Sequence, residues 1–429
     1  MWITIDLHDE CGHLHSTRSD PVAGPSLRAM AGPQMPSGGN ASTSMNAARP
    51  GRAAVGALTT TVAVSSPVFL VGGLAVQVSD DLRFSPAGLG LAVSAYFGAS
   101  ALASLPAGAL VERYGAARIS RFGIALAGAS MIGIAAAANA LWSLVAILAL
   151  GAGANAMGQL ASNTSLARHV PAGRQGLSFG VKQAAIPIST LLAGAAVPTV
   201  ALTLGWRWAF VLGGLLAFAA IPLVPADLDL PRAAHESRTR RATGALVVIG
   251  LAATLAAGSA NALGTFLVDS AVARGIAPGP AGLSLTLGSA VCVLARIIGG
   301  WQADRRPGRQ VGVIAGLLAC GAVGLALLAI PGTVPLIAGV VLGFGLGWSW
   351  PGLMNFAVVR LHPQAPAAAT SITQTGVYAG GCVGPLGLGA VATLTDYPTM
   401  WIVAAVAMVS AAALMLLGSR LLSRHPAVS

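Results

Sequence analysis

Residues 108–118 read GALVERYGAAR, and residues 300–309 read GWQADRRPGR. Each stretch places a glycine four positions before an acid–arginine pair, although only 9% of the residues in the chain are charged. The two pairs lie 192 residues apart. A motif of scarce residue types that occurs twice in one chain indicates an internal repeat.

Sliding the second half of the chain over the first by 192 positions extends the match beyond the two stretches. Charged residues, asparagine, proline and glycine all find counterparts at this single offset, without insertion or deletion. The shift places Gly108, Glu112, Arg113, Gly151, Gly153, Asn163, Arg168 and Pro171 on Gly300, Asp304, Arg305, Gly343, Gly345, Asn355, Arg360 and Pro363. Two halves of like orientation are therefore expected, related as a parallel repeat.

The composition is that of a membrane protein. Of 429 residues, 55% are hydrophobic, and the mean hydropathy is +0.76. A net charge of +11 would suggest nucleic acid in a soluble protein, but these arginines lie in short gaps between apolar runs. The expected partner is therefore the lipid bilayer and not a nucleic acid. The four cysteines show no C-x-x-C spacing, so neither a metal nor another cofactor is expected.

Twelve apolar runs are long enough to cross a hydrocarbon core of about 30 Å as helices. They cover residues 53–77, 87–110, 120–139, 141–166, 178–202, 207–225, 243–268, 282–303, 310–330, 334–358, 370–394 and 399–422. The predicted fold is all-α, with twelve transmembrane helices in two six-helix bundles. Glycine and alanine are abundant in these runs, which favours close helix packing in lipid.

The longest internal gap divides the helices six and six. We expect an N-terminal bundle over residues 51–225, a cytoplasmic linker over 226–242 and a C-terminal bundle over 243–424. Residues 1–50 and 425–429 are expected to form tails, the first of them disordered because it lacks an apolar core pattern. Within it, HDECGHLH at 8–15 either binds a divalent metal or carries histidines by chance, and we favour chance.

The distribution of basic residues predicts the orientation, because short loops rich in Lys and Arg stay in the cytoplasm. With the N-terminus inside, eighteen of them face the cytoplasm, and only Arg83, Arg207 and Arg274 lie outside. We therefore expect a multi-pass protein of the cell (inner) membrane with both termini in the cytoplasm.

At these loops the chain resembles the major facilitator superfamily, whose signature is G-x-x-x-D-R-x-G followed by basic residues. The first copy carries Glu112 in place of Asp, and the second has one extra residue before Gly308. GWRWAF at 205–210 and QTGVYAGGCVGP at 374–385 also resemble that family. The resemblance implies a conformational latch at the cytoplasmic face, made of Gly108, Glu112, Arg113, Gly300, Asp304 and Arg305. The alternative is that these arginines only anchor the loops.

Polar side chains inside apolar runs predict a central cavity, because such groups must face protein or water. They gather in the first, fourth, seventh and tenth runs, whose counterparts line the cavity in the family that the chain resembles. The candidates for substrate binding in these runs are Asn155, Gln159, Asn261, Trp348 and Asn355. Ser65 and Ser66, Asn163, Thr254 and Thr265 occur in the same runs. An equally open alternative for each amide is that it holds helices together.

Two cations lie within apolar runs, one in each half. Lys182 is the only lysine of the chain, and Arg296 lies about two turns from the cytoplasmic end of its run. For Lys182 we expect its long side chain to reach the nearby membrane surface, and for Arg296 we leave the surface and the cavity open. The alternative is that both bind an anionic or carboxylate-bearing substrate between the halves.

These features predict a secondary active transporter that moves a small solute by alternating access, and not an enzyme. No cluster of acids or nucleophile–base pair suggests catalysis, although a membrane-embedded enzyme or a transport-inactive sensor remains the alternative of another class. A drug or metabolite exporter of the same fold is also open. It is disfavoured by Ile147, where the exporters that the chain resembles carry arginine. Only Asp269, near the outer end of the seventh run, suggests a site for a coupling ion.

Overall fold

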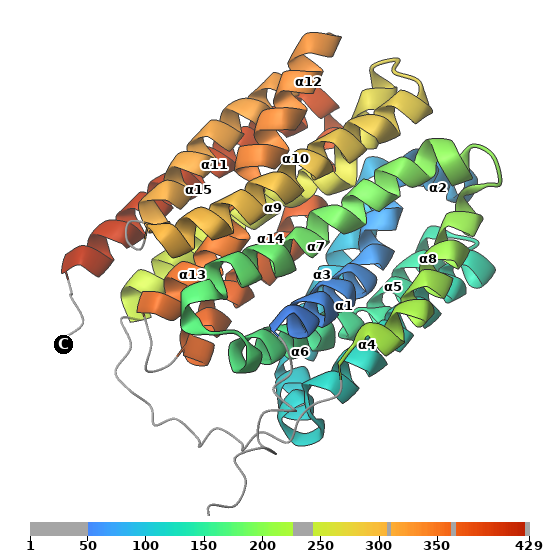
Figure 1. The fold of residues 1–429 in the computed structure, drawn as a ribbon. Coiled ribbons are helices and arrows are strands. Elements are labelled where there is room, and N and C mark those ends of the chain that lie inside the picture. Colours follow the sequence, from blue (N-terminus) through green and yellow to red (C-terminus); the bar gives the residue numbers. More distant parts are fainter. Residues whose placement is uncertain (1–49, 226–242, 307–309, 362–365, 425–429) are drawn as a thin grey trace, which may run out of the picture. The chain divides into compact units, whose positions relative to one another are not determined.

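The computed structural model describes residues 50–225, 243–306, 310–361 and 366–424. Every regular element in these ranges is helical (Figure 1). The predicted tails, the predicted linker and the HDECGHLH segment lie outside the described residues.

The first half is described from α1 to η3. Its elements are α1 (Pro50–Gly73), α2 (Ala75–Leu82), α3 (Pro86–Tyr114), α4 (Ala116–Ala137), α5 (Leu141–Gly151), α6 (Gly153–His169), η1 (Ala172–Arg174), α7 (Gln175–Ala196), η2 (Val197–Ala201), α8 (Trp206–Ala220) and η3 (Ile221–Leu223). The second half comprises α9 (Thr243–Ala273), α10 (Pro278–Arg305), α11 (Gln310–Leu327), α12 (Thr333–Leu342), η4 (Gly343–Gly347), α13 (Pro351–Leu361), α14 (Pro366–Leu394) and α15 (Tyr397–Arg424).

The prediction of twelve spans is confirmed, since the described residues contain twelve helical segments long and apolar enough to cross a membrane. The first span is shorter than its apolar run. It ends at Gly73, and the chain then forms the separate short helix α2. Two charged residues, Asp80 and Asp81, fall in α2 and stay out of the apolar span.

The fourth span of each half is interrupted at the same repeat position. In the first half, α5 ends at Gly151 and α6 begins at Gly153. In the second half, the π-helical turn η4 begins at Gly343, the counterpart of Gly151. The repeat read from the sequence therefore corresponds to a repeated irregularity of the backbone.

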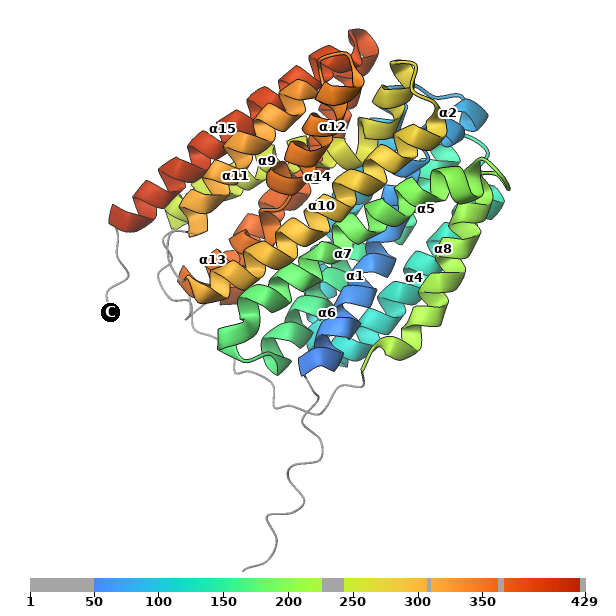
Figure 2. The same cartoon turned by 45° about the horizontal axis from the view of Figure 1, so that its top comes forward.

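The two halves meet mainly along α7 with α10 and along α3 with α14, and α7 with α13 and α1 with α9 add smaller contacts. Figures 1 and 2 show the halves as a blue-to-green group and a yellow-to-red group that face each other. Glycine permits the closest approaches. A Cβ added to Gly72 on α1 would lie 2.3 Å from the carbonyl oxygen of Gly264 on α9. Such contacts suit helices in lipid, where van der Waals packing contributes most to association.

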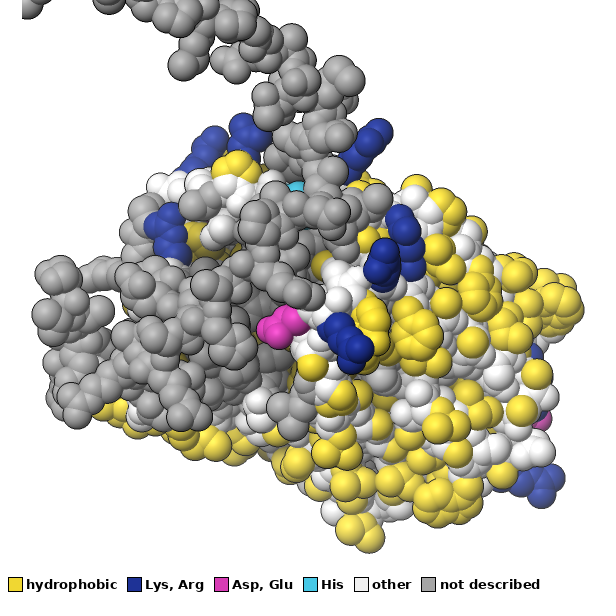
Figure 3. All heavy atoms as spheres, turned by 90° about the horizontal axis from the view of Figure 1, so that it is seen from below, with side chains coloured by type: hydrophobic (Ala, Val, Ile, Leu, Met, Phe, Trp, Pro, Cys, Tyr) yellow, Lys and Arg dark blue, Asp and Glu magenta, His cyan; other side chains and the backbone are white. Residues whose placement is uncertain are grey.

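Most described arginines lie at one end of the helices, which we call the arginine-rich end. It carries the α3–α4 turn, η1 and the last turn of α10, with exposed Arg113, Arg174 and Arg305. Figure 3 shows basic side chains around this end. At the opposite end lie Arg83, Arg207 and Arg274, as the sequence predicts. That the arginine-rich end faces the cytoplasm stays a prediction.

Candidate substrate cavity

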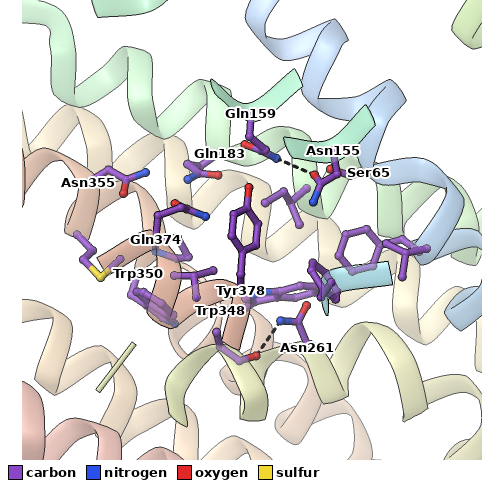
Figure 4. A pocket seen from close by; sticks show the side chains of 18 of the residues that line it. Ser65, Asn155, Gln159, Gln183, Asn261, Trp348, Trp350, Asn355, Gln374 and Tyr378 are labelled. Carbon is purple, nitrogen blue, oxygen red and sulfur yellow. Dashed lines mark hydrogen bonds between the residues drawn. The ribbon is translucent and has the colours of Figure 1, made fainter. Parts of the chain in front are cut away.

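A cavity of about 60 Å³ lies between the two halves. Four helices of the first half (α1, α3, α6 and α7) and four segments of the second (α9, α10, α14 and the stretch 348–355) contribute to its wall. Figure 4 shows polar side chains from both halves pointing toward one another. The lining residues are Ser65, Val68, Phe69, Tyr96, Phe97, Asn155, Gln159, Gln183, Ile186, Ala257, Asn261, Arg296, Trp348, Trp350, Pro351, Met354, Asn355, Gln374, Val377 and Tyr378.

Six of the seven predicted binding residues line this cavity, which brings them together from four helical segments and the break before α13. They are Asn155, Gln159, Asn261, Arg296, Trp348 and Asn355. Gln159 Nε2 donates to Asn155 Oδ1 at 3.5 Å, one turn along α6 (Figure 4). The spacing of these two amides on one helix face therefore builds one polar wall.

Lys182 does not line the cavity directly, and its side chain does not reach the membrane surface. It is 1% exposed, and its Nζ donates a hydrogen bond to Gln159 Oε1 on the cavity wall. The expectation of a surface-seeking lysine is therefore wrong for this structure. The reason is a polar partner on α6, Gln159, whose side-chain oxygen accepts a hydrogen bond from Lys182 inside the protein.

Arg296 is 2% exposed and bridges the halves at the cavity. Its Nε and Nη2 donate to the carbonyl oxygen of Trp348 at 3.1 and 2.6 Å, and its Nη1 donates to the carbonyl oxygen of Gln183 on α7. The guanidinium also lies 5.8 Å from the centroid of the Trp348 indole ring. Because a guanidinium has five N–H bonds, these contacts leave N–H groups for a further acceptor.

The cavity wall lacks carboxylates, since every lining residue of the described chain is neutral except Arg296. Asp269, the candidate for ion coupling, lies near the C-terminal end of α9, away from the cavity, and accepts a hydrogen bond from the Tyr397 hydroxyl. The buried positive charges of the cavity region therefore have no described anionic partner beside them.

Several lining residues were missed or misjudged by sequence reasoning. Tyr96 and Tyr378 both line the cavity, and Figure 4 shows Tyr378 pointing toward Gln159 and Gln183. Tyr96 donates its hydroxyl to the carbonyl oxygen of Val64. Two of only four tyrosines fall inside apolar runs, a signal that could have found them. Trp350 was missed because the backbone break before α13 was needed to place it.

Other polar residues of the same runs lie outside the cavity. Asn163, Thr254 and Thr265 do not line it, and Ser66 faces an apolar groove formed by α1, α7 and α8. Thr254 donates its hydroxyl to the carbonyl oxygen of Gly250. The helix on which a polar residue lies therefore does not by itself tell whether the residue lines the cavity, because each helix also presents polar groups to neighbouring helices.

The two copies of the signature loop differ in their contacts. Asp304 accepts hydrogen bonds from the backbone N–H groups of Gly176 and Leu177, both at 2.8 Å, at the start of α7. A carboxylate at a helix N-terminus is stabilised by the free N–H groups and the helix dipole. Gly300 permits this approach, since a Cβ there would lie 2.6 Å from the carbonyl oxygen of Gly176.

The first copy makes no comparable contact. Glu112 and Arg113 are exposed, and nothing would lie within 4 Å of a Cβ added to Gly108. Arg113 lies over the ring of Tyr114, and Arg305 over that of Trp301. Among the described residues, the contact between the halves at this loop therefore comes from Asp304 and Gly300 of the second copy.

Comparison with known proteins agrees with this architecture. A sequence model described as Major Facilitator Superfamily matches residues 54–385 and again residues 249–428. Among solved structures, the chain is similar to a bacterial homologue of the human lysosomal transporter Spinster, determined in an inward-facing and unoccupied conformation. The TM-score is 0.69 at 15% identity, over 87% of this chain and 98% of that one. The chain belongs to the Major Facilitator Superfamily.

Proposed function

We propose that this protein is a secondary active transporter that carries a small organic anion by alternating access of the cavity to the two sides of the membrane. The observation that carries the proposal is the pair of buried cations, Lys182 on α7 and Arg296 on α10, at a cavity without a described acid. One cation belongs to each half, so an anion in the cavity would contact Arg296 of the second half and be attracted by Lys182 of the first half through Gln159.

The electrostatic cost of this arrangement supports an anionic substrate. Removing one charged group from water costs several kcal/mol even after the protein relaxes. Neutral acceptors, Gln159 Oε1 for Lys182 and two backbone carbonyls for Arg296, recover part of this cost. An anion in the cavity would recover more, because the attraction between opposite charges in the poorly screened interior adds to the hydrogen bonds.

The apolar part of the wall supports an organic body on the substrate. Phe69, Phe97, Ile186 and Met354 lie around the polar groups. Apolar and aromatic walls with a few convergent polar groups are typical of small-molecule sites. A carboxylate attached to a compact apolar group would match both parts of the wall.

The proposal is tested by uptake into proteoliposomes that contain the purified protein. The panel holds labelled carboxylates of similar size, such as lactate and benzoate, with glycerol and benzyl alcohol as neutral counterparts. We expect saturable uptake of one or more anions, reduced at least tenfold by Arg296→Gln or Lys182→Gln.

The matched control is Arg207→Gln, which removes an exposed arginine outside the cavity and should preserve uptake. Uptake of neutral solutes only, or equal loss for neutral and anionic solutes in Arg296→Gln, would contradict an anion carrier.

We also propose that Asp304 and Gly300 act as the latch of the transport cycle, by stabilising the state in which α10 rests on the start of α7. The two backbone hydrogen bonds described above support this role. Glu112, Arg113, Gly108 and Arg305 would then act in the other state of the cycle or anchor the loops.

A further inference from the structure

The partners of the Arg296 guanidinium are two backbone carbonyls, and a proline leaves one of them free. In a continuous α-helix, the carbonyl of Gln183 would accept from the N–H of residue 187. Residue 187 is proline and has no N–H, so this bond is missing from α7. Arg296 Nη1, from the other half of the protein, donates to that carbonyl instead.

The second partner is free for a different reason. Trp348 lies in the irregular turn between η4 and α13, before the regular hydrogen bonds of α13 begin, and Cys292 Sγ also donates to its carbonyl oxygen at 3.6 Å. In the described part of the chain no backbone donor to the Trp348 carbonyl accompanies the two N–H groups of Arg296. One guanidinium therefore bonds to one backbone carbonyl from each half, and the carbonyl on α7 is the one that a proline leaves free.

This arrangement makes the two uses of Arg296 compete. An unsatisfied buried carbonyl is costly, so the guanidinium stabilises contact between α7 and α10 while it bonds to Gln183. A carboxylate pairs with a guanidinium best through two parallel hydrogen bonds, and three of the five N–H groups already bond to carbonyls, so a carboxylate that pairs through Nη1 competes with the Gln183 carbonyl for that nitrogen. Occupation by an anion would therefore draw Arg296 away from the Gln183 carbonyl.

We infer that Pro187 is a positioning residue, which makes Arg296 exchangeable between the Gln183 carbonyl in the empty protein and a carboxylate in the loaded one. This inference rests on the proposed anion transport, and it adds a reason for substrate to loosen the contact between the halves. Gly180 on α7 lies against the carbonyl oxygen of Arg296, so the two helices are already at closest approach there.

The test combines a double-mutant cycle with anion titration of the purified full-length protein. Pro187→Ala restores an N–H for the Gln183 carbonyl without adding bulk. We expect Arg296→Gln to lower Tm less in the Pro187→Ala background than in the wild-type background, because only the Trp348 carbonyl, and not that of Gln183, then loses its donor. Pro106→Ala, in an exposed part of α3, is the matched control and should leave the effect of Arg296→Gln unchanged.

The titration uses lactate and benzoate as probes, with the intrinsic fluorescence of tryptophan as readout, since Trp348 lies beside Arg296. We expect Pro187→Ala to lower the half-saturating concentration about tenfold, because the competing carbonyl no longer needs the guanidinium. Arg296→Gln should abolish the response in both backgrounds.

The outcomes separate this inference from the proposed function. If Arg296→Gln destabilises both backgrounds equally, Pro187 does not position Arg296, even when anion uptake proceeds as proposed. If the cycle shows coupling but neither probe responds to Pro187→Ala, the exchange with carboxylate is refuted. Coupling together with tighter probe binding supports the inference.

Discussion

Asp304→Asn tests the contact between the halves most simply, because the amide keeps the size of the carboxyl group and removes its charge. The carboxylate accepts two backbone hydrogen bonds at 2.8 Å, and the amide can accept at only one oxygen. A hydrogen bond to a charged group contributes about 1.5–3 kcal/mol. Asp304 is half-buried, so solvent screens part of this energy.

The expected loss is therefore about 1–2 kcal/mol, which corresponds to a shift of about five- to thirtyfold in the population with α10 on α7. Because a latch stabilises one state and does not contact substrate, the transport rate should change more than the substrate affinity. Proteoliposome uptake would give the rate, and equilibrium binding would give the affinity.

The population itself can be followed by pulsed EPR between spin labels at Gly173 and Gln302, two exposed positions near the contact. Cys292, Cys320 and Cys382 would first be replaced by alanine, together with Cys11. Asp304→Asn should add a longer-distance population. Glu112→Gln, the repeat counterpart without a described contact, should not. Identical distance distributions in the two variants would refute the role of Asp304.

Three further predictions follow from particular contacts. Gly72→Ala would place a Cβ 2.3 Å from the Gly264 carbonyl oxygen and should push α1 and α9 apart at this contact, which pulsed EPR would detect as a longer distance between the halves. Gly316→Ala, whose Cβ would have no atom within 4 Å, should leave that distance unchanged. A hydrogen bond from Arg207 lowers the pKa of Asp81, so this contact should stabilise the folded protein slightly at neutral pH and lose that effect as the pH drops below about 4. The Tm values of wild type and Asp81→Asn should therefore converge below that pH. If the arginine-rich end is cytoplasmic, a reporter inserted near Arg240 should be cytoplasmic, and a periplasmic signal would overturn the orientation.

The spans were predictable because each of them is an apolar run of sufficient length. Inside a bilayer the backbone of such a run must satisfy its own hydrogen bonds, which a helix does. The repeat was visible because Asp304 and Arg305 are charged residues in a chain of which only 9% is charged. The short helix α2 was not separated from the first span, because apolar residues continue past Gly73 into an amphipathic segment.

The cavity was predictable in outline and not in detail. Asn155, Gln159 and Asn261 lie in apolar runs, where polarity alone marks them. The partner that holds Lys182 inside lies on another helix, and the sequence contains no distance between α6 and α7. Tyr96 and Tyr378 have no tyrosine counterpart in the repeat, so the symmetry argument passes over them.

The contacts that differ between the halves were the least predictable. The sequence repeat predicts the same role for Glu112 and Asp304. In a single conformation, however, the two halves touch only over part of their surfaces, and this contact includes Asp304 but not Glu112. The relation of Pro187, Gln183 and Arg296 likewise depends on the register between α7 and α10. Such registers follow from glycine contacts between helices far apart in the chain.

The central claim is that the two halves move about a cavity whose buried cations bind an anion. The most direct measurement is pulsed EPR on one protein labelled in turn at the arginine-rich end and at the opposite end, with and without saturating benzoate or lactate. The account predicts that the anion shifts the two distances in opposite directions, and that Arg296→Gln removes the response. Distances that both stay fixed, or that lengthen together, would contradict it.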